Sequence, residues 1–203
     1  MILVGRYLSP FARRVAATLQ WLDIPYEHRS LSPAQDAEAI RAFNPMVKVP
    51  ALVLDDGEIL IESSAILDSV LEMVPGQTLL PAKGPDRRRV LQQSGILTNA
   101  LDKSIAALYE KAKRPKEKIH QPFLDSLIAQ AQAGMDQIEE QVAAGKFGGL
   151  KKPTIADITA AVSYSFMNAM LPDAGNPERH PALAAFAAEF EQTPAFKACQ
   201  FKV

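Results

Sequence analysis

The stretch MILVGRYLSPFARRVAATLQWLD, residues 1–23, changes from one hydrophobic period to another within a few positions. Its first residues form a short apolar run that is typical of a buried strand. From Pro10 to Asp23 the period is helical, because Val15, Leu19 and Leu22 recur at spacings of four and three residues. The stretch therefore predicts a strand that leads directly into a helix, with Ser9 at the junction.

The residues that follow predict a small α/β arrangement. YEHRSL, residues 26–31, alternates like a strand, and Ser32-Pro33-Ala34-Gln35 has the form of a capping box that starts a helix reaching about Phe43. Asp56-Gly57 lies between two apolar runs and predicts a hairpin. Ser63 and Ser64 offer an N-cap for a last helix. The predicted order is strand, helix, strand, helix, strand, strand, helix, and the pattern alone does not give the order of the strands in the sheet.

The composition changes at PGQTLLPAKGPDRRR, residues 75–89, which reads as a linker. The residues beyond it have helical periodicity throughout, with a capping box at Thr154–Asp157 and prolines at 181 and 194 that open two shorter helices. Because the helices are segregated from the sheet, we expect an α+β chain. The predicted parts are an α/β domain at 1–76, a linker at 77–85 and an all-helical domain at 86–203.

Composition limits the classes of function. The chain has 203 residues, is 48% apolar and carries a net charge of −1, so its overall charge does not favour nucleic acid or a membrane surface as a partner. Its three histidines are far apart and lack metal-ligand spacing, and Cys199 is its only cysteine. No apolar stretch approaches the ~20 residues that span a bilayer. We expect a cytoplasmic protein without a metal site or a disulfide.

Ser9 has two interpretations. A serine before a proline at the start of a helix is a common N-cap pair, worth about 1 kcal/mol. Ser9 also stands at the carboxyl end of a strand and at the positive end of a helix dipole, where an anion is stabilised. Lowering the pKa of a thiol by ~2 units takes about 2.7 kcal/mol. A hydroxyl bond to a charged acceptor supplies ~1.5–3 kcal/mol and the helix end ~0.3–2 kcal/mol, so Ser9 can activate the thiol of another molecule.

Two further segments combine structural and ligand-binding interpretations. In NPMVKVPALV, residues 44–53, Pro50 opens a strand, either as an ordinary edge proline or with a cis peptide bond. A bend of the second kind leaves the backbone of Val49 free to pair with an extended peptide. In IESSAI, residues 61–66, Glu62 and Ser63 form either a plain helix start or a site where the serine binds a carboxylate and Glu62 binds an ammonium group.

The segments SPFARRV, NPMVKVPALV, IESSAILDSV and PTIADI, taken in this order, resemble the glutathione transferase superfamily over essentially the whole chain. The resemblance implies a thioredoxin-like domain that binds glutathione, followed by an all-α domain that covers a pocket for the electrophile. It also implies a homodimer and no metal. The chain departs from the family pattern at Val47, where the family usually has glycine, and this departure bears on the reach of Lys48.

The resemblance assigns the parts of glutathione to particular residues. Ser9 is the catalytic residue, which donates a hydrogen bond to the glutathione sulfur, and Phe11 belongs to the same site. Lys48 holds the glycyl carboxylate, and Val49 with cis-Pro50 pairs with the cysteinyl backbone. The γ-glutamyl end is bound by Glu62 and Ser63.

Tyr7 is the alternative to Ser9, because the tyrosine-type classes use a tyrosine at the end of the first strand. We prefer Ser9, which precedes Pro-Phe and caps the helix. Tyr7, Tyr109, Phe166 and Met170 are candidates for lining the electrophile pocket, although the last three suit the helical core equally well. A serine in place of cysteine at position 9 argues against thiol transfer and dehydroascorbate reduction.

Three functions are therefore compatible with the sequence. The first is a glutathione S-transferase that conjugates glutathione, as co-substrate, to small hydrophobic electrophiles in detoxification. The second is a glutathione-dependent isomerase or dehalogenase, and the third is a transferase-like binding protein without turnover. Retention on glutathione resin and a chlorodinitrobenzene assay distinguish them. The sequence does not identify the electrophile.

Overall fold

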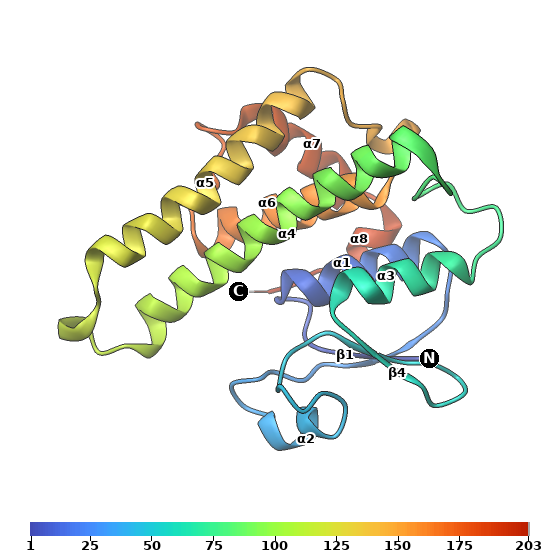
Figure 1. Cartoon of the computed structure of the whole chain (residues 1–203), viewed down its shortest axis with the longest axis horizontal. Coiled ribbons are helices and arrows are strands. Elements are labelled where there is room, and N and C mark those ends of the chain that lie inside the picture. The colour runs from blue at the N-terminus through green and yellow to red at the C-terminus, as the bar shows by residue number, and fades with distance from the viewer. Residues whose placement is uncertain (203) are drawn as a thin grey trace. The chain divides into compact units, whose positions relative to one another are not determined.

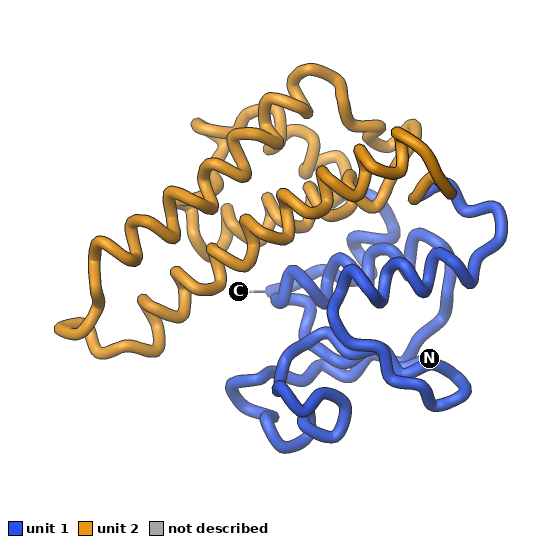
Figure 2. Tube along the Cα trace, in the orientation of Figure 1, with its two compact units in different colours: residues 1–79, 192–203 blue, residues 80–191 orange. Residues whose placement is uncertain are grey.

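The computed structural model describes residues 1–202. Its contacts divide the chain into two compact units, residues 1–79 with 192–203 and residues 80–191 (Figure 2). The first unit is therefore discontinuous in sequence, since it includes the last residues of the chain. The domain limits expected at residues 76 and 86 stay a prediction, because this division describes contacts and not independent folding.

The first unit contains a four-stranded sheet in the order β2-β1-β3-β4. β1 and β2 are parallel, with Leu3 opposite His28, and the other two pairs are antiparallel. The predicted order of strands and helices is confirmed, including the hairpin at Asp56-Gly57. The elements are β1 (Ile2–Val4), α1 (Pro10–Trp21), β2 (Glu27–Arg29), α2 (Ala37–Arg41), β3 (Ala51–Val53), β4 (Ile59–Ile61) and α3 (Ser63–Glu72).

Helices α1 and α3 pack against each other on one side of the sheet, and α2 lies on the other side (Figure 1). Residues of α1, α3 and the central strands form the core between them, and these side chains are almost fully buried: Leu3, Val4, Val15, Leu19, Leu52, Ile66, Leu67 and Val70. The burial of Val15 and Leu19 confirms the helical stripe expected from the first stretch of sequence. The start of α1 is thereby fixed at the carboxyl end of β1.

The expected start of the second helix is wrong. The pattern Ser32-Pro33-Ala34-Gln35 predicted a helix from Pro33, but α2 begins only at Ala37. The Asp36 carboxylate accepts a hydrogen bond from the backbone N–H of Ser32 at 2.8 Å, and the N–H of Asp36 donates to the carbonyl of Ser32 at 2.7 Å. These bonds close a turn over residues 32–36, because an Asp side chain competes with helical hydrogen bonds for nearby backbone groups.

The last residues of the chain pack on α1. Helix α8 (Pro194–Ala198) contacts α1, and the Nε of Arg13 donates to the carbonyl of Cys199 at 3.0 Å. The Arg13 guanidinium also lies over the rings of Phe196 and Phe201, 5.3 and 4.9 Å from their centroids. Arg13 is almost fully buried, so these contacts compensate for its removal from water.

The second unit is helical, as the sequence predicted. α4 and α5 run side by side, α6 packs on α4, and α7 packs on α6 and α5 (Figure 1). The capping box at Thr154 and Asp157 is confirmed, and α7 and α8 begin at the two expected prolines. The elements are α4 (Gly84–Lys113), a 3₁₀ turn at Lys116–Lys118, α5 (Gln121–Ala143), a 3₁₀ turn at Gly149–Lys151, α6 (Ile155–Met170) and α7 (Pro181–Glu191).

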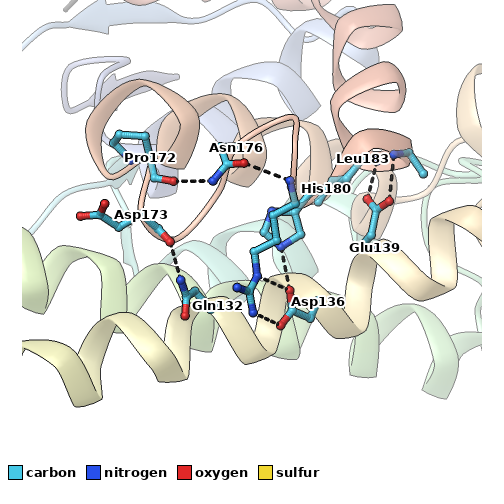
Figure 3. Close-up of polar contacts among 10 residues, drawn as sticks. Gln132, Asp136, Glu139, Pro172, Asp173, Asn176, His180 and Leu183 are labelled. Carbon is cyan, nitrogen blue, oxygen red and sulfur yellow. Dashed lines mark hydrogen bonds and ion pairs between the residues drawn. The ribbon is translucent and has the colours of Figure 1, made fainter.

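One polar face of α5 holds the segment that leads into α7 (Figure 3). The Gln132 side chain donates to the carbonyl of Asp173 at 2.6 Å, and Asp136 accepts two bonds from Arg179 at 2.8 and 2.7 Å. The Arg179 guanidinium holds the pKa of the Asp136 carboxyl below its usual range. One turn further, the Glu139 carboxylate accepts from the first backbone N–H groups of α7, those of residues 182 and 183, at 2.9 and 2.8 Å. A neighbouring helix thus caps α7.

Replacing Glu139 with alanine is expected to lower the free energy of unfolding by about 1–2 kcal/mol, because two N–H groups at the positive end of α7 lose a charged acceptor. Urea denaturation measures this change. Glu140→Ala is the matched control, since Glu140 is exposed and its removal is expected to change stability by less than about 0.5 kcal/mol. Equal losses in the two variants would contradict the capping role of Glu139.

None of the helices in residues 1–202 is both long enough and apolar enough to cross a membrane.

Candidate functional site

Ser9 is the N-cap of α1, as both of its interpretations require. Its backbone is extended (φ −69°, ψ 118°), and its Oγ accepts a hydrogen bond from the N–H of Ala12 at 3.4 Å. Because the Oγ is the acceptor in this bond, the hydroxyl proton remains available to another acceptor. Ser9 is only partly buried, so capping and donation to a ligand are compatible.

Tyr7 is held by residues around β2. Its hydroxyl lies 3.0 Å from the hydroxyl of Tyr26, and its ring stacks on His28 with centroids 3.9 Å apart and planes 4° apart. Burial, followed by the hydrogen bond with Tyr26, raises the pKa of Tyr7 above its usual range. Either hydroxyl of the Tyr7–Tyr26 pair can be the donor, so Tyr7 can donate to a thiolate only where it accepts the bond from Tyr26, whereas no other group of residues 1–202 accepts the Ser9 proton. The geometry therefore favours Ser9 over Tyr7.

The loop before β3 leaves the backbone hydrogen-bonding groups of Val49 unpaired in the described part of the chain. The Val49–Pro50 bond is cis, which is one of the two interpretations of this proline. The buried Asn44 side chain braces the loop, because its amide donates to the carbonyl of Lys48 at 3.0 Å and its oxygen accepts from the N–H of Met46 at 3.0 Å. Within residues 1–202, the backbone N–H and C=O of Val49 have no hydrogen-bond partner. They are available to an added strand.

Gly5 brings this loop close to α1. Its φ is +130°, and a Cβ on Gly5 would lie 2.8 Å from the Cβ of Val49 and 3.1 Å from the Cβ of Ala12. The end of β1, the first turn of α1 and the loop at Val49 therefore meet at one point. Three segments that are separate in the sequence are brought together there.

Val47, the departure from the family pattern, lies in the left-handed region with φ +53°. This conformation suits glycine and disfavours a β-branched residue, at about 1–2 kcal/mol. Val47→Gly is expected to raise the free energy of unfolding by up to about 1 kcal/mol, because relief of this strain exceeds the added entropy of an unfolded glycine. Urea denaturation is the measurement. A Val47→Gly protein no more stable than Val47→Ala would contradict this account, because alanine keeps the Cβ.

The start of α3 differs in detail from the expectation that Ser63 or Ser64 caps it. Glu62 is the N-cap, with φ +70°, and its carboxylate accepts from the N–H groups of Ser64 and Ala65 at 3.0–3.1 Å. The Ser63 side chain is buried, and its Oγ accepts a hydrogen bond from Arg14 at 3.0 Å. The Ser63 hydroxyl donates to the Glu62 carboxylate, with a long distance of 3.5 Å between the Ser63 Oγ and the Glu62 Oε1.

Arg14 was not identified from the sequence, where it is one of two arginines inside an apolar helix. Its guanidinium is almost fully buried and donates to the hydroxyls of both Ser63 and Ser64, at 3.0 and 3.2 Å. Burial lowers the pKa of Arg14 to about 10, and the negative charge of Glu62 partly offsets this effect. The signal in the sequence is the presence of two adjacent arginines, Arg13 and Arg14, within an otherwise apolar helix.

The remaining predicted residues lie as follows. Phe11, in the first turn of α1, is partly exposed, and Lys48 is exposed. In the helical unit, Phe166 is buried in α6, Met170 is the last residue of that helix, and Tyr109 is exposed on α4 with the Lys113 ammonium 3.8 Å from its ring centroid. Their roles stay predictions. Within residues 1–202, no cluster of three histidine, cysteine or acidic side chains is suited to a metal ion.

Comparisons with known proteins identify the family. Residues 3–78 match the family described as glutathione S-transferase, N-terminal domain. The chain is 27% identical over 173 residues to the uncharacterized GST-like protein YibF of Escherichia coli K12. The aligned region covers 83% of this chain and 82% of that protein. It is 33% identical over 101 residues to a maleylpyruvate isomerase of Ralstonia, over 48% of this chain and 47% of that enzyme.

A solved structure covers the whole chain. It is a glutathione transferase family member from Pseudomonas fluorescens Pf-5 with bound glutathione, and it superposes with a TM-score of 0.87 at 28% identity, over 100% of this chain and 99% of that one. The expected fold class is thereby confirmed as a thioredoxin-like βαβαββα domain followed by an all-helical domain. On these matches, residues 3–78 belong to the family of glutathione S-transferase N-terminal domains, and the chain as a whole has the glutathione S-transferase fold.

Proposed function

We propose that this protein binds glutathione and activates its sulfur as a thiolate for attack on small hydrophobic electrophiles. The observation that carries the proposal is Ser9, whose Oγ accepts the helix-capping bond while its proton is free to be donated. The bound glutathione in the Pseudomonas fluorescens relative supports the choice of ligand. In conjugation, the thiolate forms a carbon–sulfur bond at the electrophilic carbon and the leaving group departs with the electron pair of the broken bond.

We place glutathione along three segments of the first unit. Its sulfur lies at Ser9, its cysteinyl backbone pairs with the free N–H and C=O of Val49, and Glu62 with Ser63 binds its γ-glutamyl end. Lys48, which is exposed beside Val49, binds the glycyl carboxylate. The free backbone of Val49 supports this placement, since an extended peptide binds best to a strand edge whose hydrogen-bonding groups are unpaired.

Calorimetry with reduced glutathione tests the proposal, followed by a chlorodinitrobenzene assay in which the thiolate displaces chloride. Uptake of glutathione together with turnover is the expected result. Absence of uptake at millimolar glutathione would refute the proposal. Uptake without turnover on a panel of electrophiles would leave a binding protein and refute the catalytic part.

A glutathione-dependent isomerase is the second candidate, and the match to the Ralstonia maleylpyruvate isomerase favours it. In this reaction the thiolate adds to a carbon–carbon double bond conjugated to a carbonyl group. Rotation about the resulting single bond and elimination of the thiolate then give the trans product. Glutathione is regenerated, so product formation without loss of free thiol distinguishes isomerisation from conjugation.

We also propose, from the family, that the protein is a homodimer. Light scattering on the purified protein measures its mass in solution, and a mass of one chain across the micromolar range would overturn this part of the proposal.

A further inference from the structure

Arg14 places a buried positive charge behind the first turn of α3. Its guanidinium is buried, and it lies against Ser63 and Ser64 in the first turn of α3, where the helix dipole is already positive. Burial of a cation has a large desolvation cost, and a second positive charge nearby adds repulsion to it. Glu62 supplies a nearby negative charge, but its side chain is exposed and it caps the backbone of the same helix.

The hydrogen bonds of Arg14 also set the direction of the Ser63 hydroxyl. Since the guanidinium can only donate, the Ser63 Oγ is the acceptor, and its own proton must point away from Arg14. A hydroxyl that accepts a bond from a cation is polarised and becomes a stronger donor. The contact that this proton makes with Glu62 is 3.5 Å long, so an incoming anion can replace it at little cost.

We propose that Arg14 is a positioning residue for the γ-glutamyl carboxylate of glutathione, which it serves by fixing Ser63 as a donor and by adding buried positive charge behind the N-terminus of α3. This inference rests on the proposed function. The γ-glutamyl group carries a carboxylate and an ammonium on one carbon, and the carboxylate meets Ser63 and the charge of Arg14 while the ammonium meets Glu62. Arg14 thereby connects the helix that begins at Ser9 with the helix that begins at Ser63.

The test compares two peptides on two variants. 4-Aminobutyryl-cysteinylglycine is glutathione without the γ-glutamyl carboxylate, and it keeps the ammonium, the thiol and the glycyl end. Arg14→Met is expected to weaken glutathione binding by about tenfold or more in calorimetry and to weaken binding of the aminobutyryl peptide by less than about threefold. Glutaryl-cysteinylglycine, which keeps the carboxylate and lacks the ammonium, should lose affinity as glutathione does.

Arg13→Met is the matched control, because Arg13 is the neighbouring buried arginine and bonds to the carbonyl of Cys199 instead of Ser63. It is expected to leave the ratio of the affinities for the two peptides unchanged. Arg14→Lys provides a variant that keeps the charge, in case Arg14→Met does not fold; it should show the same dependence on the carboxylate with a smaller loss. A positioning role also predicts a raised KM for glutathione, with the kinetic pKa of the bound thiol unchanged.

Equal losses for both peptides, or no loss for glutathione in Arg14→Met and Arg14→Lys, would overturn the inference. Failure of the proposed function has a different signature, since the wild-type protein would then not bind glutathione at all.

Discussion

Replacing Ser9 with alanine is expected to lower kcat/KM for conjugation by about tenfold to a hundredfold at neutral pH. The Ser9 hydroxyl donates to a charged sulfur in our proposal, and a bond of this kind contributes ~1.5–3 kcal/mol. Without the donor the thiolate is less stable, so the pKa of bound glutathione rises toward that of a free thiol, about 8.5. The pH–rate profile of the variant should therefore shift to higher pH and approach the wild-type rate in alkaline buffer.

Two variants separate catalysis from capping. Ser9→Asp keeps an oxygen that can cap α1 but cannot donate to a thiolate, so its stability should stay close to that of the wild type while its activity is lost. Tyr7→Phe should keep most of the wild-type activity, because the Tyr7 hydroxyl is already engaged with Tyr26. An inactive Tyr7→Phe beside an active Ser9→Ala would transfer the role to the tyrosine.

Gly5→Ala should destabilise the protein by about 3 kcal/mol, or about 6–12 °C in Tm for a chain of this length. At Gly5 the backbone conformation (φ +130°) and the space both exclude a side chain, because the new Cβ would lie 2.8 Å from the Cβ of Val49. The backbone must move to accommodate it. Since Val49 is the residue that we place along glutathione, binding of the tripeptide should weaken in the same variant.

Gly57→Ala is the matched control for this prediction. Gly57 also has a positive φ, +92°, but a Cβ there would meet no atom within 4 Å. It should lose about 1–2 kcal/mol from backbone strain alone and bind glutathione as the wild type does. Thermal unfolding and calorimetry measure both effects, and a Gly5→Ala protein as stable as Gly57→Ala would show that the contact with Val49 is unimportant.

The sequence predicted most of the elements of the fold, because periodicity and turn residues act locally. It did not predict the start of α2, where the Asp36 side chain closes a turn in place of the helix. It also could not give the strand order, which depends on the pairing of β1 with both β2 and β3, two strands that follow it at different distances in the sequence. Local signals do not encode such pairings.

The sequence predicted those residues of the candidate site that belong to short local motifs. Ser9, Val49 and Ser63 could be chosen because each stands at a junction between elements. Arg14 could not, because its role depends on contact with α3, almost fifty residues away in sequence. The capping of α3 by Glu62 in place of a serine was also missed, since it requires a positive φ that periodicity does not reveal.

The discontinuity of the first unit has a consequence for biosynthesis. Arg13 is buried against the carbonyl of Cys199, so the contacts around α1 are incomplete until α8 has been made. On the ribosome the sheet and its helices emerge first, yet they must wait for the whole helical unit to be translated before α8 can dock. A nascent chain stalled after residue 79 should therefore remain protease-sensitive, and the site around Ser9 should mature only late in translation.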